Sequence, residues 1–285
     1  MRLLILFVAA SYASTARAQF LKGEKPHAVF VVGTHHYSPQ LTMPKLAQQL
    51  SDSGFDCTVI LADGDPEHNP DGIGDLSALE IADVAIFYCR FLTLPDSQWK
   101  QIMDYLESKK PVVGIRTSTH AFDYEAGHKR ESWNQDFGKR VVGSGYKVHL
   151  QGTTKVAKIA AHPILDNVVM DDSFTAAGTL YISEPPAAAK VILAGTGNSK
   201  KTGTIENRFG THELRATMTS PVAWTWENEW GGRVFGTTLG HPNSFADPEV
   251  VRLFINGIYW AADEEIPTDF EPTAIEVKLP SKRKK

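Results

Sequence analysis

The sequence predicts an α/β domain with a parallel sheet, helices on both of its faces and a small antiparallel extension. In the first half of the chain, apolar runs such as His27–Gly33 alternate with segments of helical periodicity. Such runs are typical of strands that are buried on both faces. Loops rich in Gly, Pro and Asp, such as residues 62–75, separate these segments. This alternation of strands and helices implies a parallel sheet.

Each element of the first half has its own signal in the sequence. Strands are predicted at His27–Gly33, Asp56–Leu61, Val84–Tyr88 and Pro111–Ile115. Helices are predicted at Met43–Ser53, Leu76–Ile81 and Pro95–Ser108. Pro95 and Asp96 suit the beginning of a helix, because proline fits the first turn and an acid complements the positive end of the helix dipole.

The second half is less regular and supplies the antiparallel extension. Strands are predicted at Lys147–Leu150, Lys155–Ala160, Val191–Thr196, Pro221–Trp224 and Arg233–Leu239. The last two strands flank a turn at Glu227–Gly232. An amphipathic helix is predicted at Pro248–Ala261, because its apolar residues recur on one face.

The two ends of the chain are predicted to lie outside the folded domain. Arg2, the apolar run 3–13 and Ala16–Ala18 have the order of a secretory signal peptide, which we place at residues 1–18. An uncleaved anchor or a buried strand is the alternative, but the run is about half the ~20 residues that a membrane-spanning helix needs. The domain is then residues 19–263, with a polar, disordered tail at 264–285. We expect an exported protein, periplasmic or secreted, with no membrane span after cleavage.

Composition limits the possible partners. The net charge is −4, which gives no argument for nucleic acid binding. Cys57 and Cys89 both lie in strand-like runs. Export would permit a disulfide, but buried cysteines often behave as small apolar residues, so we expect two unpaired core thiols. The sequence does not indicate an oligomeric state.

Several segments carry a family resemblance. They are Asp83–Phe91, Leu94–Gln98, Pro111–Phe122, His162–Ile164, Gly232–His241 and Asn256–Ala261. Together they resemble the ThuA-like family, named for a trehalose-utilisation protein, and they keep its order over most of residues 27–262. The resemblance implies a flavodoxin-like sheet similar to that of class I glutamine amidotransferases, in agreement with the strand and helix pattern.

The resemblance also allows a test for glutaminase chemistry. In those enzymes a strand ends Gly-Ile-Cys, with the nucleophilic cysteine on a tight turn, and the matching run here is Gly114–Arg116. A guanidinium stays protonated and cannot attack an amide. His241 matches the family's histidine, but Asn243 stands where the acid would follow. Glutaminase activity is therefore not expected.

The function implied by the resemblance is carbohydrate processing. We expect an enzyme that abstracts a proton from an oxidised (3-keto) sugar or glycoside, with hydrolysis, elimination or isomerisation to follow. The alternative is a non-catalytic carbohydrate-binding or accessory protein on a decayed amidotransferase-like fold. The small-molecule partner is a carbohydrate in both cases. No G-x-G-x-x-G follows the first strand, which disfavours a nicotinamide enzyme.

The strand ends supply the candidate catalytic residues, because ligands of such sheets bind outside the carboxyl ends of the strands. Arg116 could hold a carboxylate or stabilise an enediolate, although a structural ion pair is the alternative. His120 could act as a base, a metal ligand or simply a packed residue. His241 is the third catalytic candidate, from its inherited position.

Further residues at these ends are candidates for substrate binding. They are His35, His36, Tyr37, Arg90, Thr119 and Glu213. Adjacent residues of an extended segment point in opposite directions, so we expect only one of His35 and His36 to face the site. Tyr37 could stack on a sugar ring, and Arg90 could contact a substrate oxygen, with ordinary packing and ion pairing as the alternatives.

A bound metal is a weaker hypothesis. A divalent metal such as zinc would need three or four converging ligands, and His35, His120 and His241 are the candidates by fold position alone. No H-x-x-x-H or H-E-x-x-H spacing supports them. No cofactor is predicted with certainty. We interpret His128 and His162 as surface or turn residues, and the run of Trp224, Trp226 and Trp230 as hairpin packing or a sugar platform.

Overall fold

A nine-stranded mixed sheet forms the centre of the computed structural model, which describes residues 25–64, 66–170 and 173–279. The strand order is β2-β1-β3-β4-β11-β10-β7-β5-β6. The parallel part contains β2 (Asp56–Leu61), β1 (His27–Gly33), β3 (Val84–Cys89), β4 (Val112–Ile115) and β11 (Arg233–Thr237). The antiparallel part contains β10 (Thr217–Glu227), β7 (Lys190–Asn198), β5 (Gln151–Lys158) and β6 (Phe174–Ala176). The predicted fold class is confirmed.

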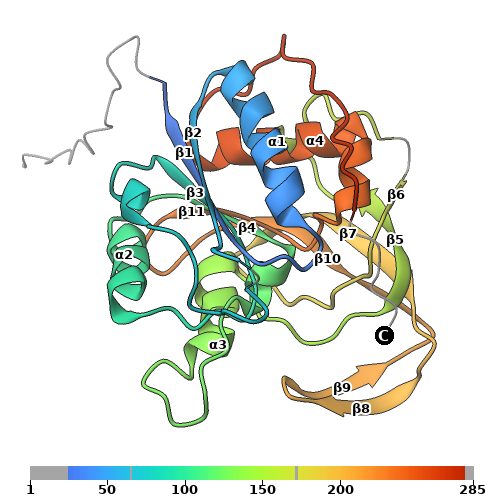
Figure 1. Ribbon diagram of the computed structural model, residues 1–285. Helices are drawn as coiled ribbons and strands as arrows, with labels where there is room; N and C mark the ends of the chain where they lie inside the picture. The colour runs from blue at the N-terminus through green and yellow to red at the C-terminus, as the bar shows by residue number, and fades with distance from the viewer. Residues whose placement is uncertain (1–24, 65, 171–172, 280–285) are drawn as a thin grey trace, which may run out of the picture.

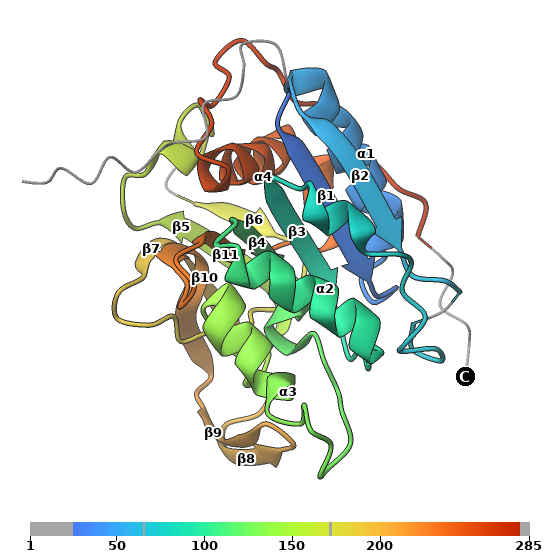
Figure 2. The same cartoon turned by 90° about the vertical axis from the view of Figure 1, so that its left-hand side faces the viewer.

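Helices cover both faces of the parallel strands (Figures 1 and 2). On one face lie α1 (Pro39–Ser53) and α4 (Pro248–Ala261), and on the other α2 (Asp96–Glu107) and α3 (Trp133–Asp136). A π-helical turn, η3 (Phe137–Val142), continues α3. Because side chains alternate along a strand, Phe30 of β1 packs with the α1 and α4 layer, whereas Val31 packs with the α2 layer.

The elements of the first half lie close to their predicted positions. All four of its strands are present, and the predicted helix at residues 76–81 is a 3₁₀ helix, η1 (Ser77–Glu80). Helix α1 begins at Pro39, four residues before the predicted start at Met43, because Pro39 suits its first turn and Pro44 does not break it.

The second half differs more from the prediction. The predicted strand at residues 147–150 is wrong, since only an isolated bridge between His149 and Tyr181 forms there. The prediction missed β6, α3 and a separate hairpin of β8 (Gly203–Asn207) and β9 (Gly210–Leu214). This hairpin projects beyond the main sheet (Figure 1).

Both cysteines are free, as predicted, but only Cys89 is a buried core thiol, whereas Cys57 is partly exposed. Burial raises the pKa of the Cys89 thiol to about 12 and that of Cys57 to about 11. Within the described residues, no helix combines the length and the apolar character needed to cross a membrane. The predicted signal peptide lies outside those residues.

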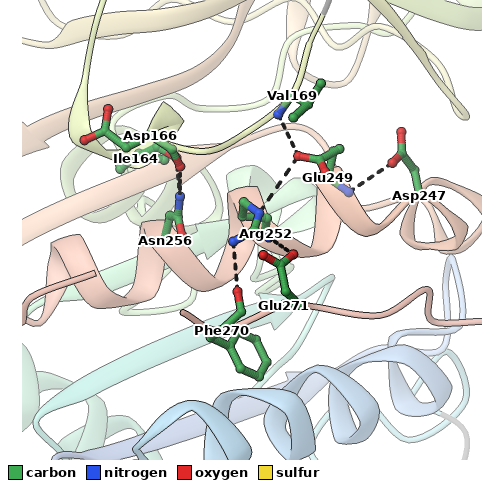
Figure 3. A network of polar contacts seen from close by, with 9 residues as sticks. All are labelled: Ile164, Asp166, Val169, Asp247, Glu249, Arg252, Asn256, Phe270 and Glu271. Carbon is green, nitrogen blue, oxygen red and sulfur yellow. Dashed lines mark hydrogen bonds and ion pairs between the residues drawn. The ribbon is translucent and has the colours of Figure 1, made fainter. Parts of the chain in front are cut away.

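The C-terminal segment corrects an expectation. Residues 264–279, predicted as part of a disordered tail, run without regular secondary structure along α4 and α1, and Ile275 is only 2% exposed. Figure 3 shows Arg252 of α4 donating hydrogen bonds to the Phe270 carbonyl at 3.0 Å and to Glu271 at 2.6 Å. The sequence pattern does not indicate this segment, because the residues that anchor it are isolated in a polar run.

Asn256, one turn after Arg252 in α4, makes a second polar contact of the same network. Buried Asn256 donates to the carbonyls of Ile164 and Asp166, at 3.1 and 2.9 Å (Figure 3). Asp247 caps the helix by accepting from the Glu249 amide at 3.0 Å. Helix α4 is thus fixed both to the loop before β6 and to the C-terminal segment.

Candidate functional site

The ends of three parallel strands meet beside a cavity of about 460 Å³. Residues that directly follow β1, β3 and β4 lie on its wall, as expected for the carboxyl edge of such a sheet. The loops before β5 and β7 and the tip of the β8–β9 hairpin supply the rest of the wall. The described lining residues are His36, Tyr37, Arg90, Phe91, His120, Tyr146, His149, Tyr181, Arg208 and Phe209.

A sharp elbow follows β4. Arg116 has a φ of 46°, in the left-handed region that residues other than glycine rarely adopt. The chain then turns into a five-residue 3₁₀ helix, η2 (Arg116–His120), all of whose residues are buried. The predicted position of the elbow is therefore occupied by arginine, and the short helix carries His120 to the cavity wall.

The Arg116 side chain lies behind the wall of the cavity. Its guanidinium is 4.0 Å from the ring centre of Tyr37 and 4.7 Å from that of Tyr181. One nitrogen donates to the Thr238 carbonyl at 2.8 Å, while Nε has no hydrogen-bond partner in the described part of the chain. Arg116 is 2% exposed, so it acts on the cavity through the two tyrosines.

The guanidinium changes the acidity of Tyr37. Burial raises the pKa of this phenol, but the Arg116 charge and hydrogen bonds with Tyr181, Arg116 and Thr179 outweigh burial, and the net pKa is below its usual value. For Tyr181, burial dominates and holds the pKa well above its usual range. Of these two wall tyrosines, Tyr37 is therefore the stronger acid.

His120 combines burial with access to the cavity. It is 4% exposed, and burial, followed by the charges of Arg90, His36, Arg208 and Arg116, holds its pKa well below 6.5. The imidazole is therefore neutral at neutral pH and able to accept a proton.

Thr119 sets which nitrogen of His120 is basic. Its hydroxyl oxygen lies 3.1 Å from the Arg116 carbonyl and 3.1 Å from Nδ1 of His120. A hydroxyl has one proton, and the carbonyl can only accept. Both contacts are satisfied when Thr119 donates to the carbonyl and His120 donates from Nδ1. Nε2 then carries the lone pair.

Aromatic rings surround His120. The ring centres of Tyr146 and Phe91 lie 4.4 and 5.1 Å from that of His120, and that of Phe209 lies 6.0 Å away. The hydroxyl of Tyr146 is 2.5 Å from Nδ1 of His149, which adds a second polar pair to the wall. Such rings shield the imidazole from water.

Two arginines contact the ring of Phe91. The guanidinium carbons of Arg90 and Arg208 are 4.1 and 4.2 Å from the Phe91 ring centre. Arg90 also pairs with Glu67 at 3.1 Å. His36 lies 3.7 Å from the same carboxylate, but burial and then the Arg90 charge lower its pKa to about 4, so this contact is no ion pair at neutral pH.

Arg208 and Phe209 come from the turn between β8 and β9. Arg208 pairs with Asp123 through two contacts of 3.0 and 2.9 Å. Asn207 donates to the Lys147 carbonyl at 3.0 Å. These contacts hold the tip of the hairpin against the elements that follow β3 and β4, so the hairpin closes one side of the cavity.

The sequence predicted part of this set. The structure brings four of the predicted residues onto the wall: His36, Tyr37, Arg90 and His120. Arg116 and Thr119 lie just behind it. As predicted, only one of the two adjacent histidines faces the site: His36 is among the lining residues and His35 is not.

The remaining predicted residues lie elsewhere. His241 packs against the far side of the wall, with its ring centre 5.5 Å from that of Tyr37, and burial followed by the Arg116 charge lowers its pKa to about 4. Glu213 lies exposed on β9 and accepts from Thr204 at 2.8 Å. His128 stacks on Tyr124 outside the cavity.

Six wall residues were not among those predicted from the sequence: Phe91, Tyr146, His149, Tyr181, Arg208 and Phe209. They lie in loops and in a mostly exposed hairpin, where no apolar periodicity marks a position. The Asn207–Gly210 turn is the one local signal, since Asn and Gly favour tight turns.

The histidines do not form a recognisable metal centre. Across residues 25–64, 66–170 and 173–279, no group of three or more His, Cys, Asp or Glu side chains is arranged to hold an ion. His35 and His241, two of the three candidate ligands, are not among the described lining residues.

Comparisons with known proteins agree with this architecture. The model of a family described as ThuA, trehalose utilisation, matches residues 28–261. A search of curated proteins gave no match.

Two solved structures share the fold. A protein described as ThuA-like from Parabacteroides merdae superposes with a TM-score of 0.58 at 16% identity, over 88% of this chain and 96% of that one. Another from Bacteroides uniformis gives a TM-score of 0.55 at 17% identity, over 86% and 94%. At these identities the likeness shows the fold alone, and it agrees with the predicted parallel sheet flanked by helices.

Proposed function

This chain belongs to the ThuA family of trehalose utilisation, and we propose that it is a carbohydrate-processing enzyme acting on an oxidised (3-keto) sugar or glycoside. The observation that carries the proposal is the neutral, buried His120, which lines a cavity of about 460 Å³ and carries its lone pair on Nε2. A cavity of this size suits a small ligand.

The first step is proton abstraction next to the carbonyl of the sugar. Nε2 of His120 takes the proton from the carbon alpha to the carbonyl, and the electron pair of that C–H bond forms an enediolate. The low pKa of His120 keeps this nitrogen unprotonated and ready at neutral pH. Hydrolysis, elimination or isomerisation can each proceed from the enediolate.

Other residues of the cavity wall stabilise the developing oxyanion. Tyr37 can donate a hydrogen bond to it, and Arg116 makes this phenol a better donor by lowering its pKa. Arg90 and Arg208 add positive charge to the same cavity. Donors and charges fixed in advance are the usual means of stabilising an oxyanion.

The NMR time course of a 3-keto disaccharide with the purified protein tests this proposal. We expect His120→Gln to lower the rate at least about 100-fold, as for loss of a general base. His128→Gln is the matched control, because His128 is exposed and lies outside the cavity. Equal rates for the two variants would refute the role of His120.

A non-catalytic carbohydrate-binding or accessory protein is the second candidate. It is favoured by the loss of the amidotransferase nucleophile, since Arg116 occupies the elbow. Retained binding of the keto sugar with no turnover over many hours would support this candidate. A parallel time course with a chelator tests whether a divalent metal such as zinc takes part.

We also propose that the protein is exported. The support is the order of charged, apolar and small residues in positions 1–18. N-terminal sequencing of the protein from an extracytoplasmic fraction would then begin at Gln19, whereas a chain beginning at Met1 in the cytoplasm would contradict export.

A further inference from the structure

The charges of the cavity wall are one-sided. The described lining residues include Arg90, Arg208 and three histidines, but no Asp, Glu, Asn or Gln. We propose, building on the function proposed above, that the sugar taken by this cavity carries an acidic group, a carboxylate or a phosphate ester, which the two arginines bind.

Donors and acceptors are unequal on this wall. The hydroxyls of a neutral sugar need acceptors as well as donors, and sites for them use carboxylates and amides for this purpose. Here the side-chain acceptors of the described lining residues are tyrosine oxygens and imidazole nitrogens. A carboxylate or phosphate only accepts, so it matches a wall rich in N–H and O–H donors.

The two arginines are placed to act on one group. Both guanidinium carbons lie close to the Phe91 ring centre, at 4.1 and 4.2 Å, which puts them within about 8 Å of each other. Their partners, Glu67 and Asp123, are 48% and 37% exposed and are not among the described lining residues. Each guanidinium therefore keeps N–H groups for a ligand.

Arg116 adds a third positive charge directly behind the wall. It is buried against Tyr37 and Tyr181, and no carboxylate of the described chain pairs with it. It donates to the uncharged Thr238 carbonyl at 2.8 Å and to the Thr179 hydroxyl at 3.5 Å. A buried charge of this kind is costly without a counter-charge, and an anion in the adjoining cavity supplies one.

The histidines respond to the same field. The charges of Arg90 and Arg116 contribute to lowering the pKa of both His36 and His120. Neutral histidines do not compete with the arginines for the anion.

Calorimetry of the full-length protein with matched sugars tests the inference. The probes are methyl glucuronide, methyl glucoside and glucose 6-phosphate, with binding measured at low and high salt. We expect at least one acidic sugar to bind about tenfold or more tightly than methyl glucoside, and the difference to shrink as salt rises. The tighter of the two acidic probes identifies the carboxylate or the phosphate as the group bound.

Variants decide whether the arginines are responsible. Arg208→Gln and Arg90→Gln should each remove most of the preference, whereas Arg140→Gln, which breaks a pair with Glu229 outside the cavity, should keep it. Equal or tighter binding of methyl glucoside, or a preference unchanged in both cavity variants, would overturn the inference. Because binding is measured without turnover, this outcome is distinct from failure of the proposed catalysis.

Discussion

His162 offers a quantitative test of how this fold keeps histidines neutral. It is 9% exposed, and Nδ1 accepts from the Ile164 amide at 3.3 Å, while Nε2 lies 3.4 Å from the Thr225 hydroxyl. Burial, followed by the charges of Lys190 and Arg233, lowers its pKa from 6.5 to about 4. Protonation of Nδ1 would break the contact with the Ile164 amide.

The sign and size of the effect follow from this shift. The unfolded chain binds the proton first, so the stabilisation is complete above the ordinary pKa of 6.5 and is lost as pH falls towards 4. Between about pH 7.5 and about pH 5 this one group accounts for about 2 kcal/mol of unfolding free energy. Below the folded pKa the loss reaches about 3 kcal/mol.

The assay is urea denaturation of the parent and of His162→Asn at both pH values. Asparagine retains an oxygen that can accept from the Ile164 amide but does not titrate. We expect the parent to be more stable near pH 7.5, and its advantage to shrink by about 2 kcal/mol near pH 5. The other histidines are present in both proteins, so their contributions to the pH dependence of stability cancel in the difference.

A gap that stays constant within about 0.5 kcal/mol would refute the reasoning. It would mean that His162 titrates near its ordinary value in the folded protein. Burial is also the main cause of the low pKa of His120. The conclusion that His120 is neutral would therefore be weakened as well.

Two further predictions concern packing and the hairpin. A Cβ at Gly257 of α4 would lie 2.3 Å from the fully buried Phe235 ring. Although alanine has the better helix propensity, Gly257→Ala should therefore lower the unfolding free energy by about 2 kcal/mol in a denaturant titration. Unchanged stability would show that the ring can move. Asp123→Asn removes the acid that pairs with Arg208, so amide hydrogen exchange in residues 203–214 should rise, while equal exchange would show that other contacts hold the hairpin.

The sequence was informative where burial imposes a pattern. The apolar runs gave the parallel strands nearly to the residue, and the strand ends gave His36, Tyr37, Arg90 and His120. Parallel strands are buried on both faces, so their positions are visible as continuous apolar runs.

The rest depended on contacts that no local pattern encodes. Arg208 reaches the cavity only because a polar hairpin folds across it, and Tyr181 comes from a loop. The position of Arg116 was predicted, but its enclosure by Tyr37 and Tyr181 depends on residues far apart in the chain. The anchoring of residues 264–279 by Arg252 is likewise a long-range contact in a segment of low apolar content.

The β8–β9 hairpin carries ligand-binding residues on a different element from the proposed base. The proposed base, His120, lies on a short helix next to the central sheet. Arg208 and Phe209 lie on the β8–β9 hairpin, which is a separate two-stranded sheet. Changes at the hairpin tip can therefore alter which ligand is accepted without disturbing the core. The hairpin is therefore the natural place to redesign selectivity.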